Sequence, residues 1–322
     1  MRDLPSLFSA LPLPQNDWAE RSLAAGLIAS QTTGDLPFSS WNGNILSAIA
    51  HGAYEVFFND NGVMCGYCTW LALPDAGTEI AIQDGLDAVP AALRNNGKDI
   101  WISQLAVRGI PMRHVFRHLR SRAFRHTACI FYERKVRGRR IVRCLHQAQT
   151  TLQAAPMPPS LSKARAADLS ASLQRFTSIG QALFAVRKSS YHLNRTVGEL
   201  TYRFGELHDL RQMRVYTAHD SEPIACLGWS FLSRRTIRRM AHHPLEYADP
   251  SEWNEGAHLY FWPLAIASAC CDMVEHDMAI LCGPSMTAHV LLPVSGASQP
   301  VPWQRGTPLP LETTDPARAG AA

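Results

Sequence analysis

The feature that most constrains this 322-residue chain is an internal repeat with a fixed offset. When the sequence is compared with itself, Trp70 aligns with Trp229, an offset of 229 − 70 = 159. The same register, without a gap, aligns Val56 with Val215, Leu73 with Leu232, Leu86 with Leu245, Gly97 with Gly256, Leu105 with Leu264 and Ala106 with Ala265. A constant register over this span predicts that the two halves of the chain fold alike.

The proline-rich stretches predict how the chain divides. The stretch TTLQAAPMPPSLSKARAADLS holds three prolines and many small residues, which is typical of an exposed linker. The end of the chain is also rich in proline and holds little apolar material. We therefore expect a first copy over residues 1–150, a linker over 151–168, a second copy over 169–283 and a flexible tail over 284–322.

The composition is that of a folded, water-soluble protein, with 46% apolar and 18% charged residues. No apolar run approaches the roughly eighteen residues of a membrane-spanning helix, and the N-terminus lacks the basic start of a secretory signal. We expect a cytoplasmic protein with no membrane span. The formal net charge of +4 gives no general sign of nucleic-acid binding.

The eight cysteines lack the regular spacing of a disulfide framework, so we expect reduced, buried thiols. The pair Cys65-Gly-Tyr-Cys68 leaves zinc or redox chemistry open as an alternative. Zinc would need further ligands at suitable spacing, and redox chemistry would need the pair at a helix N-terminus. The pair lies inside a β-rich run instead, so we expect no metal and no bound cofactor.

Each copy begins with a helical stretch, at residues 18–30 and 169–188, and continues into β-rich runs. The Asn59-Asp60-Asn61-Gly62 cluster predicts a hairpin turn, because Asn and Gly tolerate positive φ. The order of elements predicts an α+β fold in each half.

One region of the first copy, residues 108–143, is strongly basic. It would suit an acidic protein partner, although a solvated helix face explains it equally well. It shows no recognisable nucleic-acid-binding motif. The arginines in question are Arg113, Arg117, Arg120, Arg137, Arg139 and Arg140.

The run VMCGYCTWL at residues 63–71, followed by the predicted strand at 101–107, resembles the lysine acyltransferases that activate RTX toxins. In the second copy, the helix that ends at Ser189-Ser190-Tyr191-His192 resembles that family's first helix, where a Ser-x-x-His motif contains a catalytic histidine. The resemblance implies a GNAT-like acyltransferase fold, here duplicated. It also implies a fatty acyl group supplied by acyl carrier protein as donor substrate and a lysine ε-amine of an RTX protoxin as acceptor.

The two copies depart from the family at the positions that matter for catalysis. With the offset of 159, His192 aligns with Thr33 and Ser189 with Ser30, so the first copy has lost the histidine. The family's aspartate position is Gln104 in the first copy and Pro263 in the second. Neither copy holds the full His/Asp pair, and we expect the first copy to be inactive.

The proposed chemistry needs a base, because a lysine amine with a pKa of about 10.4 is protonated at neutral pH. His192 would act as this base or as a nucleophile, and Ser189 would orient the ring or donate to the oxyanion. The alternative is that His192 only complements the dipole at a helix C-terminus.

Three functions follow from these observations. The first is protein-lysine fatty acyl transfer, with acyl carrier protein docked on the basic region. The second is an inactive homologue that binds the carrier or the toxin as an adaptor. The third is acetyl transfer from coenzyme A, which would want a glycine-rich loop that the chain lacks. A pseudo-dimer of the two copies, or a homodimer, is also compatible with the duplication.

Overall fold

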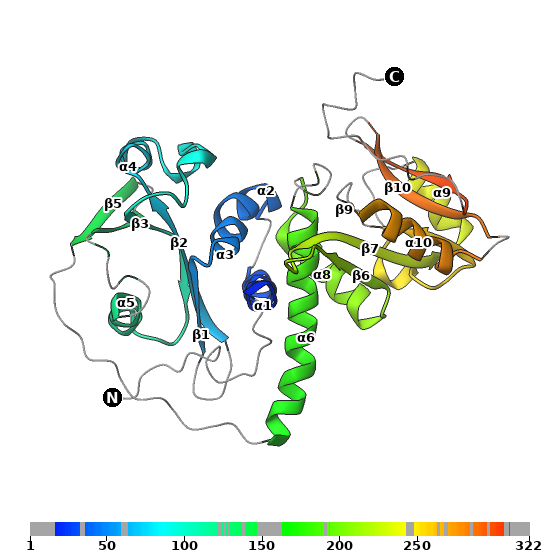
Figure 1. Ribbon diagram of the computed structural model, residues 1–322, viewed down its shortest axis with the longest axis horizontal. Coiled ribbons are helices and arrows are strands. Elements are labelled where there is room, and N and C mark those ends of the chain that lie inside the picture. Colours follow the sequence, from blue (N-terminus) through cyan, green and yellow to red (C-terminus); the bar gives the residue numbers. More distant parts are fainter. Residues whose placement is uncertain are drawn as a thin grey trace. The chain divides into compact units, whose positions relative to one another are not determined.

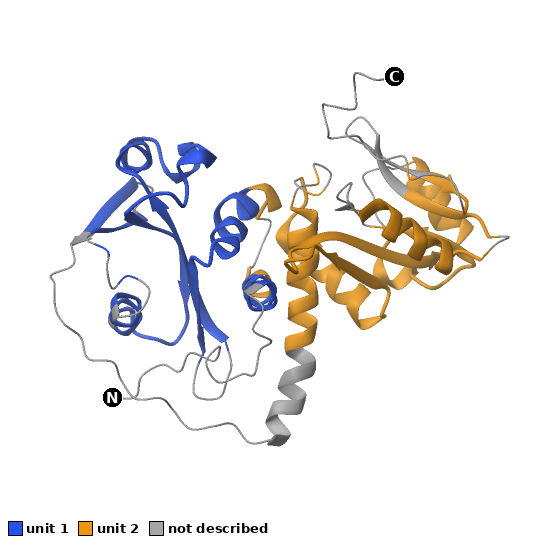
Figure 2. Cartoon of the chain, in the orientation of Figure 1, with its two compact units in different colours: residues 1–28, 40–172 blue, residues 29–39, 173–322 orange. Residues whose placement is uncertain are grey.

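The computed structural model describes residues 17–32, 36–58, 64–121, 124, 127, 129–136, 139–146, 163–187, 189, 192, 194–242, 248–262, 265–266, 270–283, 286–294, 297–305 and 309 (Figure 1). The chain folds as two compact units (Figure 2). Unit 1 comprises residues 1–28 and 40–172, and unit 2 comprises residues 29–39 and 173–322. The predicted turn at residues 59–62 lies outside the described residues.

The helices and strands of the first half run from α1 to β5. In order they are α1 (Asp17–Gln31), α2 (Phe38–Trp41), η2 (Asn42–Leu46), α3 (Ser47–Ala50), β1 (Tyr54–Phe58), β2 (Met64–Leu73), α4 (Asp75–Gln83), η3 (Leu86–Ala88), η4 (Ala91–Leu93), β3 (Asp99–Val107), α5 (Met112–Ser121), β4 (Cys129–Val136) and β5 (Arg139–His146). The strands pair in the order β1-β2-β3-β4-β5, with β3 and β4 parallel and the other pairs antiparallel.

The sheet of unit 1 has an apolar cluster on each face because its central strands alternate apolar side chains between the faces. In β3, Ile100 and Ile102 belong to one cluster, together with Val115 and Leu119 of α5. Trp101 belongs to the opposite cluster, with residues of β2, α3 and α4. Both faces of the central strands are thus buried.

The second half repeats this order from α6 to β11. Its elements are α6 (Lys163–Val186), α8 (Val197–Asp209), β6 (Met213–Thr217), β7 (Pro223–Leu232), α9 (Arg234–His242), η5 (Pro250–Glu252), β8 (His258–Phe261), β9 (Ala265–Ile266), α10 (Cys271–Leu281), β10 (Ala288–Val294) and β11 (Ala297–Trp303). The strand order is β11-β10-β8-β7-β6, with β9 also paired to β7. This is the order of the first sheet, so the predicted duplicated α+β fold is confirmed.

The offset found in the sequence also separates the elements. Strands β2 and β7 differ by 223 − 64 = 159 at their first residues and by 232 − 73 = 159 at their last. The same holds for β1 and β6 and for α4 and α9. Even the register shift at the end of the first hairpin recurs, after Phe57 in one copy and after Tyr216 in the other.

A backbone contact that only glycine permits brings the chain back to the sheet in each half. A Cβ on Gly97 would lie 1.8 Å from the carbonyl carbon of Leu73, and a Cβ on Gly256 would lie 2.0 Å from the carbonyl oxygen of Leu232. Two residues earlier, Asn95 and Asn254 both have a φ of 63°. Asn tolerates this left-handed conformation better than most residues, so the two turns are built alike.

A polar pair between the edge strand and the helix after the central strand is kept, with the acidic residue on the strand in one copy and on the helix in the other. In unit 1, Glu55 of β1 pairs with His118 of α5 at 3.0 Å. In unit 2, Arg214 of β6 pairs with Asp277 of α10 at 2.5 Å, and these are the repeat equivalents of Glu55 and His118. Both copies keep a pair at these two positions, but the strand carries the acidic residue in unit 1 and the basic residue in unit 2.

The predicted flexible tail over residues 284–322 is wrong for residues 288–294 and 297–303, which form β10 and β11. Strand β10 pairs in parallel with β8, and β11 pairs with β10. The prolines are accommodated because β11 is the outermost strand, where a missing N–H costs no sheet hydrogen bond on the open side. Pro293 lies beyond the two residues through which β10 pairs with β8.

The other predicted boundaries stay predictions. The helix α6 begins at Lys163, inside the predicted linker, whereas residues 151–162 lie outside the described residues. Residues 29–39 lie within the first copy in sequence but belong to unit 2. None of the described helices is long and apolar enough to cross a membrane.

The end of the chain should contribute to the stability of unit 2. Trp303 is 2% exposed and packs edge-on against Phe261 at 6.1 Å between ring centres. We predict that Trp303→Ala lowers the free energy of unfolding by about 3–5 kcal/mol through the cavity it leaves. The exposed neighbour Arg305 is the control, and Arg305→Ala should change it by less than about 0.5 kcal/mol. Equal effects in a denaturant titration would contradict the packing of β11.

Candidate functional site

His192 lies just after α6, in a short turn closed by backbone hydrogen bonds. The N–H of Ser189 donates to the carbonyl of Val186 at 3.0 Å, and the N–H of His192 donates to the carbonyl of Ser189 at 3.1 Å. The N–H of Arg195 then donates to the carbonyl of His192 at 3.0 Å. The Ser-x-x-His motif is therefore a single turn in which the backbone of Ser189 holds that of His192.

Residues from the first copy of the repeat fix the chain after His192. The N–H of Phe38 donates to the carbonyl of Arg195 at 2.6 Å, and the N–H of Val197 donates to the carbonyl of Leu36 at 3.0 Å. Pro37 and Thr196 form the bridge between these two bonds. All of these residues belong to unit 2.

This bridge is symmetric in the repeat, because each residue faces its own equivalent: 196 − 37 = 159. Phe38 is fully buried. The side chain of Thr196 also caps α8 by accepting from the N–H of Glu199 at 3.2 Å. The first copy thus contributes backbone hydrogen bonds to the segment that carries His192.

The imidazole of His192 is buried, with only 1% of the residue exposed. Burial, followed by the positive charges of Arg195 and Arg203, lowers the pKa of His192 to about 3. Glu199 lies between these arginines in sequence and pairs with Arg195 at 3.4 Å and Arg203 at 3.5 Å. His192 is consequently neutral at physiological pH and lies in a cationic environment.

Arg203 connects this environment to the central strand of the sheet. Its guanidinium carbon lies 5.9 Å from the ring centre of Trp262, the residue that follows β8. The indole N–H of Trp262 donates to the hydroxyl of Ser230 on β7 at 2.9 Å, and Trp253 packs edge-on against the same ring at 4.5 Å. The polar groups near the end of β8 are thus a buried indole and a buried hydroxyl.

The central strand of unit 2 is interrupted where that of unit 1 is continuous. Strand β8 ends at Phe261 and Trp262 lies outside any strand, whereas β3 runs unbroken from Asp99 to Val107. The N–H of Trp262 still donates to the carbonyl of Gly228 at 2.7 Å, but a proline follows it, which has no N–H to donate. Pro263 itself lies outside the described residues.

A family model for the RTX toxin acyltransferase family matches residues 24–148 and 171–278, which together make up most of the chain. The chain belongs to the RTX toxin acyltransferase family. A comparison with curated proteins found no match. The two matched segments are the two copies of the repeat, so this chain is a tandem duplication of the acyltransferase fold of that family.

The equivalent site in the first copy of this acyltransferase fold has no histidine. Ser30 is exposed near the end of α1, and Thr33 lies outside the described residues. Gln104 accepts a hydrogen bond from the hydroxyl of Tyr67 at 2.9 Å, and Thr69 and Ser103 pair next to it at 2.8 Å. This position is filled by neutral hydrogen-bonding groups and offers no base.

The predicted carrier-binding arginines of the first copy differ in their exposure and in their partners. Arg140 is committed to Glu133 at 2.5 Å and to the carbonyls of Ile82 and Ala81. Arg120 is only partly exposed, whereas Arg117 and Arg139 are exposed. The side chains of Arg113 and Arg137 lie outside the described residues.

The sequence analysis missed a second basic segment, in unit 2. Helix α9 carries Arg234, Arg235, Arg238 and Arg239 within nine residues. The run RRTIRR is visible in the sequence, but the exposure of its arginines on one face of a helix is not. It also missed Glu199, whose importance depends on α8 bringing it close to Arg195 and Arg203.

The low pKa of His192 predicts a loss of stability in acid. Between the unfolded value of about 6.5 and the folded value of about 3, the unfolded chain binds more protons, so stability falls as pH falls through this window. The contribution of His192 approaches about 1.4 kcal/mol per pH unit. His192→Gln should remove this part of the slope in urea titrations between pH 6.5 and 4. An unchanged slope would show that the imidazole is accessible to protons in the folded protein.

Proposed function

We propose that this protein transfers a fatty acyl group from acyl carrier protein to internal lysine residues of an RTX protoxin, in the cytoplasm, with His192 as its base. The observation that carries the proposal is the buried, neutral His192, held by the Ser-x-x-His turn in the copy that retains this motif. Only a neutral imidazole can accept a proton from an attacking amine.

In the proposed reaction the acceptor lysine first loses its ammonium proton to bulk water, and the neutral nitrogen then attacks the thioester carbon of the donor. The C–N bond forms, His192 accepts the proton of the amine, and the C–S bond then breaks. The proton passes from the imidazolium to the departing thiolate of the carrier. Arg195 and Arg203 would stabilise the negative charge that develops on the thioester oxygen. This stabilisation would offset the lowering of the pKa of His192 that the same two arginines cause.

The GNAT-like assignment and the role of Ser189 belong to the same proposal. The described contact of Ser189 with His192 is made by its carbonyl, so we propose a positioning role through the backbone. Ser189→Ala should then keep most of the activity, because the substitution leaves that carbonyl in place.

A second function, an adaptor that binds the carrier or the toxin without catalysis, is favoured by one specific observation. The pKa of His192, at about 3, is far below that of an efficient general base near neutral pH. The family's aspartate, which would raise it, is replaced by proline in this copy. The two functions differ in whether acyl transfer occurs at all.

The deciding experiment is acyl transfer in vitro, with the purified protein, acyl carrier protein loaded with palmitate and an RTX protoxin, followed by intact mass. We predict that His192→Ala lowers the rate by at least about 100-fold, which is the contribution of a positioned base. The control is His208→Ala, a histidine near the end of α8 in the same unit, which should retain activity. Binding of the carrier or the protoxin without transfer by the wild type would instead support the adaptor.

A further inference from the structure

Helix α9 presents three arginines to solvent on one face. Arg234, Arg235 and Arg238 are exposed, whereas Thr236, Ile237 and Met240 are buried against unit 2. Within the described part of the chain, no hydrogen bond or ion pair engages these three guanidinium groups. The outer face of α9 is therefore a compact group of uncompensated positive charges.

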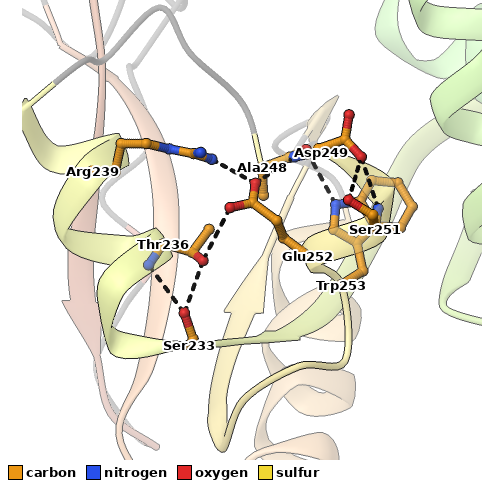
Figure 3. Close-up of polar contacts among 8 residues, drawn as sticks. All are labelled: Ser233, Thr236, Arg239, Ala248, Asp249, Ser251, Glu252 and Trp253. Carbon is orange, nitrogen blue, oxygen red and sulfur yellow. Dashed lines mark hydrogen bonds and ion pairs between the residues drawn. The ribbon is translucent and has the colours of Figure 1, made fainter.

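Helix α9 itself is held by a capping side chain and by an ion pair, which Figure 3 shows. Ser233 caps α9 by accepting from the N–H of Thr236 at 3.1 Å. The fourth arginine, Arg239, pairs with Glu252 at 2.5 Å, and Glu252 also accepts from the N–H of Asp249 at 2.8 Å. Arg239 thus has a structural partner, which distinguishes it from the other three.

The fold does not require positive charge on this face. The equivalent helix α4 of unit 1 has the same length and carries acidic or neutral residues at the same exposed positions. With the offset of 159, the pairs are Arg234 and Asp75, Arg235 and Ala76, and Arg238 and Glu79.

The arginines also act against the stability of their own helix. Arg234 and Arg235 lie in the first turn, where the positive end of the helix dipole disfavours cations. Arg234 and Arg238, like Arg235 and Arg239, are like charges at i and i+4, which repel. Charges that the fold neither needs nor favours indicate a role outside folding.

We propose that the outer face of α9, formed by Arg234, Arg235 and Arg238, is the docking surface for the acidic acyl carrier protein. The inference rests on the proposed function, since that reaction requires a carrier to deliver its thioester to the unit that holds His192. Arginine side chains suit this role because the guanidinium binds carboxylates in a bidentate manner. Charge complementarity would raise the rate of encounter and make binding sensitive to salt.

The surface lies in the same unit as His192 and is linked to it through packed side chains. Glu252, the partner of Arg239, precedes Trp253, which packs on Trp262. The ring of Trp262 in turn lies near Arg203, whose charge acts on His192. The first copy offers a weaker candidate, because Arg140 is already bound to Glu133.

The test replaces the three arginines by the residues of the equivalent helix, as Arg234→Asp/Arg235→Ala/Arg238→Glu. The control variant, Arg211→Asp/Arg305→Glu/Lys98→Ala, makes the same two charge reversals and one neutralisation at exposed positions outside α9 and outside the basic region 108–143. Binding of palmitoyl acyl carrier protein is measured by calorimetry at low and physiological salt, and acyl transfer is measured in parallel. Thermal unfolding verifies that both variants fold.

We expect the α9 variant to bind the carrier about tenfold more weakly or worse, with a smaller salt dependence, and the control to bind like the wild type. Equal carrier binding by the α9 variant and the wild type would overturn the docking surface, even if transfer proceeds. Weakened binding of the protoxin alone would overturn it as well and assign α9 to the toxin. A wild type that binds the carrier through α9 but transfers nothing would retain the surface and reject the enzymatic function.

Discussion

The close approach of Gly256 to the backbone of Leu232 is the constraint on which the rest of unit 2 depends. It allows the chain to leave β7, form α9 and η5, and return beside the same strand as β8. That return places Trp262 against Ser230 and near Arg203, and so builds the environment around His192. Gly97 and Leu73 make the same contact in unit 1, where no histidine is present. The contact therefore determines the path of the backbone, and the side chains that this backbone carries determine the chemistry.

The two units show how far side chains at equivalent positions can differ while the backbone fold stays the same. Where unit 1 packs Gly77 against Leu93, unit 2 has Thr236 hydrogen-bonded to Glu252 at 3.4 Å. The Glu55–His118 pair of unit 1 is likewise replaced in unit 2 by Arg214–Asp277, in which the acidic residue lies on the helix. Loss of the histidine in the first copy fits this freedom, because its helix α1 still packs without it. The first copy remains useful to unit 2 through residues 36–38, which hold the backbone next to His192.

Much of the fold was predictable from the repeat, because a fixed offset reports backbone geometry even when few side chains are identical. The helix-then-strand order of each copy and the placement of Cys65 and Cys68 in a strand were predicted from the sequence. The proline content misled the prediction for residues 288–294 and 297–303, because composition does not reveal that a strand lies at a sheet edge. The partners of Arg140 were not predictable for a related reason: Glu133 and the end of α4 meet it only through strand pairing and packing.

The central claim is that this duplicated acyltransferase has a single reactive centre, located in unit 2 at His192. The most direct test uses acyl carrier protein that carries a 2-bromoacyl group, which alkylates a nucleophile next to the bound acyl chain. Peptide mass spectrometry then locates the cross-link. The account predicts one cross-link per chain, on the peptide that contains His192 and absent in His192→Ala. A cross-link within residues 24–148 would contradict it, because the first copy would then hold the acyl group.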